Sequence, residues 1–248
     1  MRLREVVRVS GDASLDSARI PQLIEGLVAH GDALDVATLA REHGDARVRA
    51  VPVVRGEVAI DERRGLVATE TTLGEALEGI MSGDGSRYVM SALDELPPAL
   101  RNRLDRTVPP RARGTRKLWV SAPGTVSTLH FDVQRNVHSV VSGAKRFLLY
   151  PPRASLRLYP RGLLDGVPNG AHVDPERPDL VRHPRFAGVE GWVTDVRTGE
   201  SVLVPPGWWH HVRTLEPTVA VNTWWSIGLA RGVAALADLY KRARGVSR

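Results

Sequence analysis

The sequence predicts a mainly β protein with a strand-rich core, residues 116–226, behind an amino-terminal part of helices and first strands, residues 1–115. Two observations predict this class. Beyond residue 115, short runs of β-favouring residues are bounded by Gly and Pro, whereas before it apolar residues recur at helical spacing. No internal repeat or Pro/Ser-rich linker divides the 248 residues, so we expect a single domain, residues 1–248.

The composition limits the compartment and the partners. Apolar residues make up 42% and charged residues 25% of the chain, as in soluble globular proteins. The chain has no membrane-length apolar run, no secretory signal and no Cys, so we expect a cytoplasmic protein without a membrane partner and without thiolate chemistry. The net charge of +6 favours anionic partners, but the scattered arginines indicate a solvated basic surface more than a nucleic-acid interface.

In the amino-terminal part, apolar spacing predicts two helices within residues 16–43, broken around Gly31. Residues 48–54 predict a strand, at a sheet edge because Pro52 has no N–H group. Residues 71–81 predict an amphipathic helix that begins at a Thr cap and ends at Gly83. A strand over residues 87–91 and a helical stretch over residues 93–104, interrupted by two prolines, complete this part.

The core is expected to consist of strands over residues 117–121, 127–133, 137–141, 146–150, 201–204, 210–215 and 219–225. The turn-rich interval 151–199 predicts a long insertion between core strands, with a helical turn at residues 175–181. Residues 227–248 predict a closing amphipathic helix. That helix could cover the barrel or form a homodimer with a second subunit.

The triplet His130-Phe131-Asp132 is the first chemical signal. Side chains two residues apart on a strand share a face, so this His and Asp could bind one metal ion, although such a pair also arises by chance on surface strands. The following hairpin can bring Asn136 and Lys145 onto the same inner face. A lysine inside a barrel needs an anion, because an unpaired buried charge is costly; otherwise Lys145 sits in solvent at the turn.

The third metal ligand is expected in GWWHHV, directly after a Pro-Gly turn. His210 and His211 face opposite ways on a strand, so one of them can bind metal and the other is structural. Two His and one Asp form the facial triad of non-haem Fe(II) oxygenases, although zinc could occupy the same donors. His138 has the parity of a further ligand, but we favour a satisfied buried histidine. Apolar bulk around the centre would come from Trp208, Trp209, Trp224 and Trp225, and for most of them we expect core packing more than substrate stacking.

Four ordered motifs carry a more specific signal: GTVSTLHFDVQRN, SGAKRFLLYPP, GESVLVPPGWWHHV and VAVNTWW. Together they resemble the Jumonji C family, in its small, cupin-like hydroxylase branch, which includes the asparaginyl hydroxylase that inhibits hypoxia-inducible factor. The resemblance covers residues 117–152 and 199–226 and is weaker in the amino-terminal half. It implies a double-stranded β-helix, or jelly roll, with flanking helices at both ends.

Matched residue by residue, the resemblance implies an iron site at His130, Asp132 and His210, which selects His210 over His211. It implies that Lys145 holds the distal carboxylate of 2-oxoglutarate. The other cosubstrate residues that the motifs match are Ser127, Asn136, Asn222 and, on an earlier strand, Tyr88. The implied cofactors are Fe(II), 2-oxoglutarate and O2.

The activity implied by the resemblance is an Fe(II)- and 2-oxoglutarate-dependent dioxygenase. It would hydroxylate an unactivated C–H bond of a protein or peptide side chain, or of an amino-acid-derived small molecule. Two alternatives share this chemistry: hydroxylation of a tRNA base, for which the basic residues 101–117 could provide contacts, and N-methyl-lysine demethylation. A different class is a non-catalytic cupin-like binding or regulatory protein, because a fold does not determine a function. The triad together with Lys145 favours catalysis.

Overall fold

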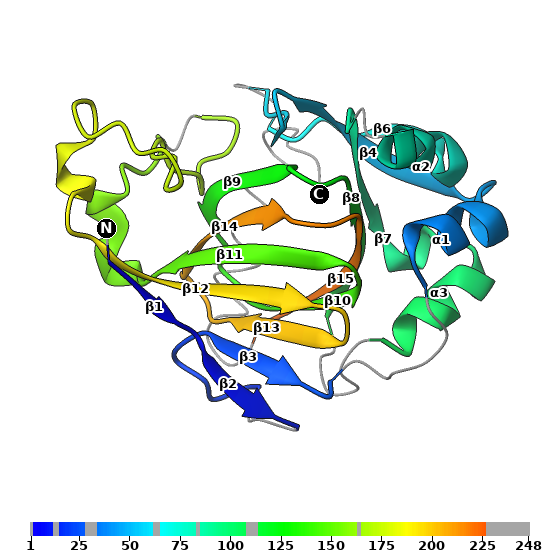
Figure 1. The fold of residues 1–248 in the computed structure, drawn as a ribbon, viewed down its shortest axis with the longest axis horizontal. Coiled ribbons are helices and arrows are strands. Elements are labelled where there is room, and N and C mark those ends of the chain that lie inside the picture. Colours follow the sequence, from blue (N-terminus) through cyan, green and yellow to red (C-terminus); the bar gives the residue numbers. More distant parts are fainter. Residues whose placement is uncertain are drawn as a thin grey trace.

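A computed structural model describes residues 2–11, 15–27, 34–61, 65–82, 85–107, 114–162 and 165–226. The strands in these parts of the chain form two facing sheets that are joined through β4 and curve into a nearly closed barrel (Figure 1). The mainly β, jelly-roll core is therefore confirmed. The helix expected over residues 227–248 lies outside the described residues.

The two sheets are built from strands that are far apart in sequence. The first contains, in spatial order, β1 (Arg2–Glu5), β12 (Glu190–Arg197), β11 (Ala144–Tyr150), β14 (Trp209–Thr214), β9 (Val126–Phe131) and β5 (Glu57–Val58). The second contains β2 (Val7–Ser10), β3 (Gln22–Glu25), β13 (Glu200–Val204), β10 (Arg135–Ser142), β15 (Thr218–Trp225), β8 (Thr115–Ser121), β7 (Arg87–Ala92) and β4 (Arg47–Val54), with β6 (Thr69–Thr72) also on β4. Between β8 and β15 the chain passes from one sheet to the other at nearly every connection. The inner faces of the two sheets therefore enclose one common interior.

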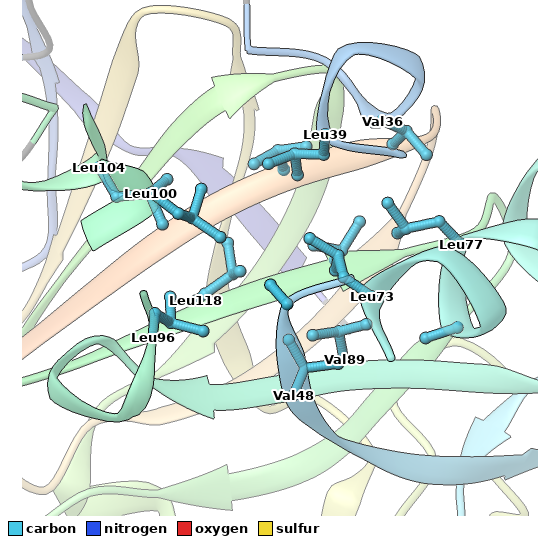
Figure 2. Close-up of a cluster of buried hydrophobic side chains, with 14 of the residues drawn as sticks. Val36, Leu39, Val48, Leu73, Leu77, Val89, Leu96, Leu100, Leu104 and Leu118 are labelled. Carbon is cyan, nitrogen blue, oxygen red and sulfur yellow. The ribbon is translucent and has the colours of Figure 1, made fainter. Parts of the chain in front are cut away.

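Three helices cover the outer face of the second sheet: α1 (Val36–His43), α2 (Leu73–Ser82) and α3 (Pro98–Asp105). Figure 2 shows their apolar side chains meeting those of β4, β7 and β8. The labelled members of this cluster are Val36, Leu39, Val48, Leu73, Leu77, Val89, Leu96, Leu100, Leu104 and Leu118. Burial of this surface fixes the outer layer, so that β7 and β8 can present their opposite faces to the barrel interior.

The caps of two helices explain where they begin. Asp35 precedes α1 and its side chain accepts a hydrogen bond of 2.7 Å from the Thr38 N–H group. At α2, Thr72 and Glu75 form a capping box, in which each side chain accepts from the other's backbone N–H group, at 3.3 and 3.2 Å. The predicted helix 71–81 is thus confirmed, but it begins later because Thr71 pairs within the sheet.

Two predictions in the amino-terminal part are wrong. Residues 22–25 are strand β3, not the first of two helices, because they pair with β13 and β2; the second helix is α1. The strand at 48–54 exists as β4 but is flanked on both sides by β6 and β7 at Ala50. The Val53 N–H group donates to the Ser86 carbonyl on the side of β4 that faces β7. The nitrogen of Pro52 therefore faces the opposite side, where the pairing with β6 has already ended at Ala50, so the sheet tolerates its missing N–H group. The strand at 87–91 and the helical stretch at 93–104 are confirmed as β7 and as a short 3-10 turn followed by α3.

The insertion is shorter than expected. Residues 190–197 form β12, a core strand between β1 and β11, so the insertion covers residues 151–189. Its described residues contain two 3-10 segments, Pro152–Arg157 and Pro184–Phe186, while residues 175–181 form bends and turns in place of the predicted helical turn. Its apolar side chains cover the outer face of the first sheet. None of the helices in the described ranges has the length and apolar character of a membrane span.

Candidate metal centre

Strand alternation divides the side chains of β14 between the two faces of the first sheet. His210 faces the barrel interior, whereas Trp209 and His211 face outward, toward the insertion. His210 pairs with His130 of β9, and the centroids of these two rings are 4.2 Å apart. Asp132 follows the end of β9, where its backbone carbonyl accepts a hydrogen bond from Gly207 in the turn before β14.

The three predicted metal ligands converge. One ligand atom each from His130, Asp132 and His210 lies within 4.8 Å of the others, and Nε2 of His210 is 3.7 Å from Oδ2 of Asp132. The Nδ1 atoms of both histidines bond to backbone carbonyls two residues earlier, at 2.7 Å for His130 and 3.1 Å for His210. Since a carbonyl only accepts, each Nδ1 carries the proton and each Nε2 keeps its lone pair for a metal.

The electrostatics of the site favour neutral imidazole. Burial, and next the nearby His130, lower the pKa of His210 to about 4, against the opposing effect of Asp132. A neutral imidazole is the form that binds a metal. His130 and Asp132 are half-buried, while His210 is 3% exposed, so the centre is accessible from one side. The donor set therefore fits a divalent iron or zinc ion.

A second layer of polar groups holds the carboxylate. Oδ2 of Asp132 accepts hydrogen bonds from Nε1 of Trp224, at 2.8 Å, and from Nδ2 of Asn136, at 3.2 Å. Asn136 is in turn fixed by Asn222, whose Nδ2 donates to its Oδ1 at 3.0 Å. Asn136 and Asn222 were expected at the site and lie there. Of the four tryptophans, Trp208, Trp209 and Trp225 are buried, as predicted for most of them, whereas the half-buried Trp224 bonds to Asp132 through its indole.

Lys145 lies deep in the same interior. It is 1% exposed, and no ion pair formed by a described residue includes it. Burial lowers the pKa of Lys145 from 10.5 to about 7. Its Nζ donates to Oη of Tyr88 at 3.5 Å and lies 5.3 Å from the Tyr88 ring centroid. A buried amine with a phenol neighbour and no carboxylate partner fits the far end of an anionic ligand.

Ser127 and Tyr88 also reach this deep end. Burial raises the pKa of Tyr88 to about 12, an effect that a side-chain hydrogen bond with Ser127 opposes. Ser127 is three positions before His130, and on a regular strand this odd spacing would place the two side chains on opposite faces. A bulge resolves this conflict: His210 pairs with His130 but Val212 pairs with Ser127, so β9 contains one residue more than β14 in this interval.

The outer face holds a second group. Asp174, Glu176 and His211 place one ligand atom each within 4.8 Å of one another, and Nε2 of His211 is 3.4 Å from Oε2 of Glu176. Nε of Arg213 donates to both Glu176 oxygens, at 2.8 and 2.9 Å, and Arg213 and His211 hold the pKa of that carboxyl far below its usual range. This group borders a cavity of about 380 Å³. Because Arg213 occupies the carboxylate, the group acts as an ion-paired anchor between the insertion and β14, the structural role expected for His211.

The fold and the site together define the class of protein: a jelly-roll barrel with two histidines and an aspartate converging on its inner face as a candidate metal centre. The family model for a cupin-like domain matches residues 14–229. The chain therefore belongs to the cupin-like domain family, and its relatives confirm the likeness to Jumonji C hydroxylases and demethylases.

Three relatives illustrate the range. The human bifunctional peptidase and (3S)-lysyl hydroxylase JMJD7 is 30% identical over 181 residues, which are 62% of this chain and 57% of that protein. The lysine-specific demethylase JMJ31 of Arabidopsis thaliana is 34% identical over 124 residues, 49% of this chain and 23% of that protein. The human tRNA wybutosine-synthesizing protein 5 is 32% identical over 106 residues, 43% of this chain and 32% of that protein. The matched part thus spans between about a quarter and somewhat over half of these relatives.

Proposed function

We propose that this protein is an Fe(II)- and 2-oxoglutarate-dependent hydroxylase that acts on an unactivated C–H bond of a protein or peptide side chain, or of an amino-acid-derived small molecule. One observation carries the proposal. The barrel interior combines a His-Asp-His donor group with a fully buried lysine that has no acidic partner among the described residues. A metal alone would explain the donors, whereas a metal together with an anionic ligand would account for Lys145 as well.

The chain's own residues would divide the work as follows. His130, Asp132 and His210 hold the metal, and Trp224 orients Asp132. Lys145 neutralises the distal carboxylate of the cosubstrate. When bound, iron(II) and 2-oxoglutarate supply the oxidation: O2 and 2-oxoglutarate are consumed, a substrate C–H becomes C–OH, and succinate and CO2 are released.

The difference in burial indicates how the two organic ligands would share the barrel. Lys145 is at the buried end, so the cosubstrate would occupy the deep part of the interior. The half-buried His130 and Asp132 would leave the accessible side of the metal to the substrate. An amino-acid side chain is favoured as substrate because the relative with the longest match reported above is named a lysyl hydroxylase.

The test is iron content together with succinate formation. Protein loaded with iron under anaerobic conditions is mixed with 2-oxoglutarate and air in the presence of peptides, free amino acids or tRNA. The wild type should release succinate above its basal rate with a substrate from one of these groups. Asp132→Ala should lose both iron and succinate formation, while Asp174→Ala, which changes the outer carboxylate group, should keep both. Unchanged iron content in Asp132→Ala, with no succinate from any mixture, would reject the proposal.

Hydroxylation of a tRNA base is the second candidate, since the human tRNA wybutosine-synthesizing protein 5 is a relative. The basic residues 101–117 would be the contact region, although residues 108–113 lie outside the described residues. Two of its arginines already form ion pairs, Arg103 with Glu42 and Arg116 with Asp105. Binding of tRNA that weakens steeply with salt would support this candidate, and binding that is undetectable or insensitive to salt would remove it.

A further inference from the structure

His138 is a buried polar group for which the proposed chemistry has no role so far. It lies on β10, two residues after Asn136, and therefore on the same inner face. Its side chain is 4% exposed, and its ring packs edge-on against Phe147 of β11, with centroids 5.2 Å apart. Its Nε2 atom makes no hydrogen bond of normal geometry with a described residue. A buried polar atom of this kind calls for a partner.

The position of His138 is between the two ends of the site. Along the first sheet, His210 pairs with Leu149, and Lys145 is four residues earlier on that strand, so their backbones are about 13 Å apart. The His138 ring packs on Phe147, which is two residues after Lys145 and two before Leu149 on the same face of β11. The ring therefore lies between the two ends of the site.

The protonation state of His138 follows from the same neighbours. Burial, and next the Lys145 ammonium, hold the pKa of His138 well below its usual range. A neutral imidazole has one N–H donor and one acceptor nitrogen. A side-chain hydrogen bond with Asn222, the cross-strand neighbour of His138, opposes this lowering of the pKa, but it is a poor one, since Oδ1 of Asn222 and Nε2 of His138 both lack a hydrogen bond of normal geometry among the described residues. The ring can thus offer an N–H group to a ligand.

We propose that His138 is a positioning and specificity residue for the cosubstrate, which donates a hydrogen bond from Nε2 to the distal carboxylate of 2-oxoglutarate beside Lys145. The inference rests on the proposed function. This role explains why the neutral imidazole of His138 and the amine of Lys145 share one interior. A carboxylate accepts several hydrogen bonds, and a neutral N–H group adds one without a second buried positive charge. The contact discriminates by ligand length, since a 2-oxo acid without a distal carboxylate would not reach it.

The test uses two substitutions of similar volume. His138→Gln retains an N–H donor, whereas His138→Met removes it. Calorimetry under anaerobic conditions gives the dissociation constants of 2-oxoglutarate and of 2-oxobutyrate, which has no distal carboxylate, for iron(II)-loaded protein. His138→Met should weaken 2-oxoglutarate binding about tenfold or more, as for a lost hydrogen bond to a charged group, and leave 2-oxobutyrate binding unchanged. His138→Gln should restore most of the loss.

The controls separate this inference from the function on which it rests. His43 of α1 also has a buried Nε2 that makes no hydrogen bond of normal geometry with the described part of the chain, but it lies outside the barrel, so His43→Met should bind both ligands as the wild type does. If His138→Met does not fold, His138→Phe, which can pack on Phe147, replaces it. Equal weakening of both ligands, or no weakening at all, would overturn the role of His138 alone. A wild type that binds no 2-oxoglutarate would overturn the proposed function itself.

Discussion

Replacement of Lys145 by Met tests the electrostatics of the barrel interior without any ligand. Methionine keeps much of the aliphatic volume but removes the charge. A fall in the lysine pKa from 10.5 to about 7 means that burying this group costs the metal-free protein about 5 kcal/mol at pH 7. Lys145→Met should therefore stabilise the metal-free protein at pH 7, by several kcal/mol at most, since packing losses offset part of the gain.

The pH dependence gives the sharper result. Between pH 7 and 10.5 the unfolded chain keeps the Lys145 proton that the folded protein has released, so the stability of the wild type rises with pH. The advantage of Lys145→Met should shrink by about 1.4 kcal/mol per pH unit in this range. Urea unfolding at pH 7, 8 and 9, with chelator present, measures it, and comparison of the two proteins cancels the titration of other groups.

Arg146→Met is the matched control for this experiment. Arg146 is the next residue on β11, but it is exposed and forms an ion pair with Asp195. Its substitution should change stability by an amount that is constant between pH 7 and 9. An equally constant difference for Lys145→Met, or a destabilisation at pH 7, would refute the assignment of Lys145 as an uncompensated buried amine.

Two further predictions concern the groups around the centre. Trp224→Phe should weaken metal affinity about 10- to 100-fold in a metal titration, because Asp132 loses a hydrogen bond. Trp225→Phe, which removes a hydrogen bond to Asp16, is the control and should leave the metal affinity unchanged. Equal effects of the two substitutions would contradict the role of Trp224. Glu176→Gln should cost about 1.5 to 3 kcal/mol in urea unfolding with iron content unchanged, because Arg213 loses its charged partner. Glu190→Gln, whose partner Arg4 is exposed, should cost less than about 1 kcal/mol, and a similar cost for both would contradict the anchor.

The barrel strands could be predicted from sequence because their signal is local. Each core strand carries β-favouring residues between Gly or Pro turns, and strand parity alone places His130 with Asp132 and separates His210 from His211. The role of Trp224 could have been found in the same way, since it is two residues after Asn222 on one strand.

Other features depend on pairing that no local pattern reports. Ser127 reaches the inner face only through a bulge in β9, and the resemblance, not parity, indicated it. Residues 22–25 match helical spacing, but hydrogen bonds to β13 and β2 decide their conformation. Strand β12 has no regular alternation of buried and exposed residues, so its sequence does not indicate a strand. Strands β1 and β2 are largely exposed, so apolar alternation does not indicate them either.

The ion-paired anchor was also beyond sequence reasoning, because Glu176 and Arg213 are far apart in the chain and come together only when the insertion folds onto the first sheet. Its consequence is that the two adjacent histidines have separate tasks. His210 faces the candidate metal centre, and His211 faces the insertion. The insertion is thus attached to the strand that also carries His210.

The most direct test of the account is the visible absorption of the purified protein under anaerobic conditions. Addition of 2-oxoglutarate to the iron(II)-loaded wild type should produce a new absorption band, because metal and cosubstrate would meet inside the barrel. The band should be absent in Asp132→Ala and weakened at a given 2-oxoglutarate concentration in Lys145→Met. No band in an iron-containing wild type, or an undiminished band in Asp132→Ala, would contradict the assignment of this interior as an iron and 2-oxoglutarate site.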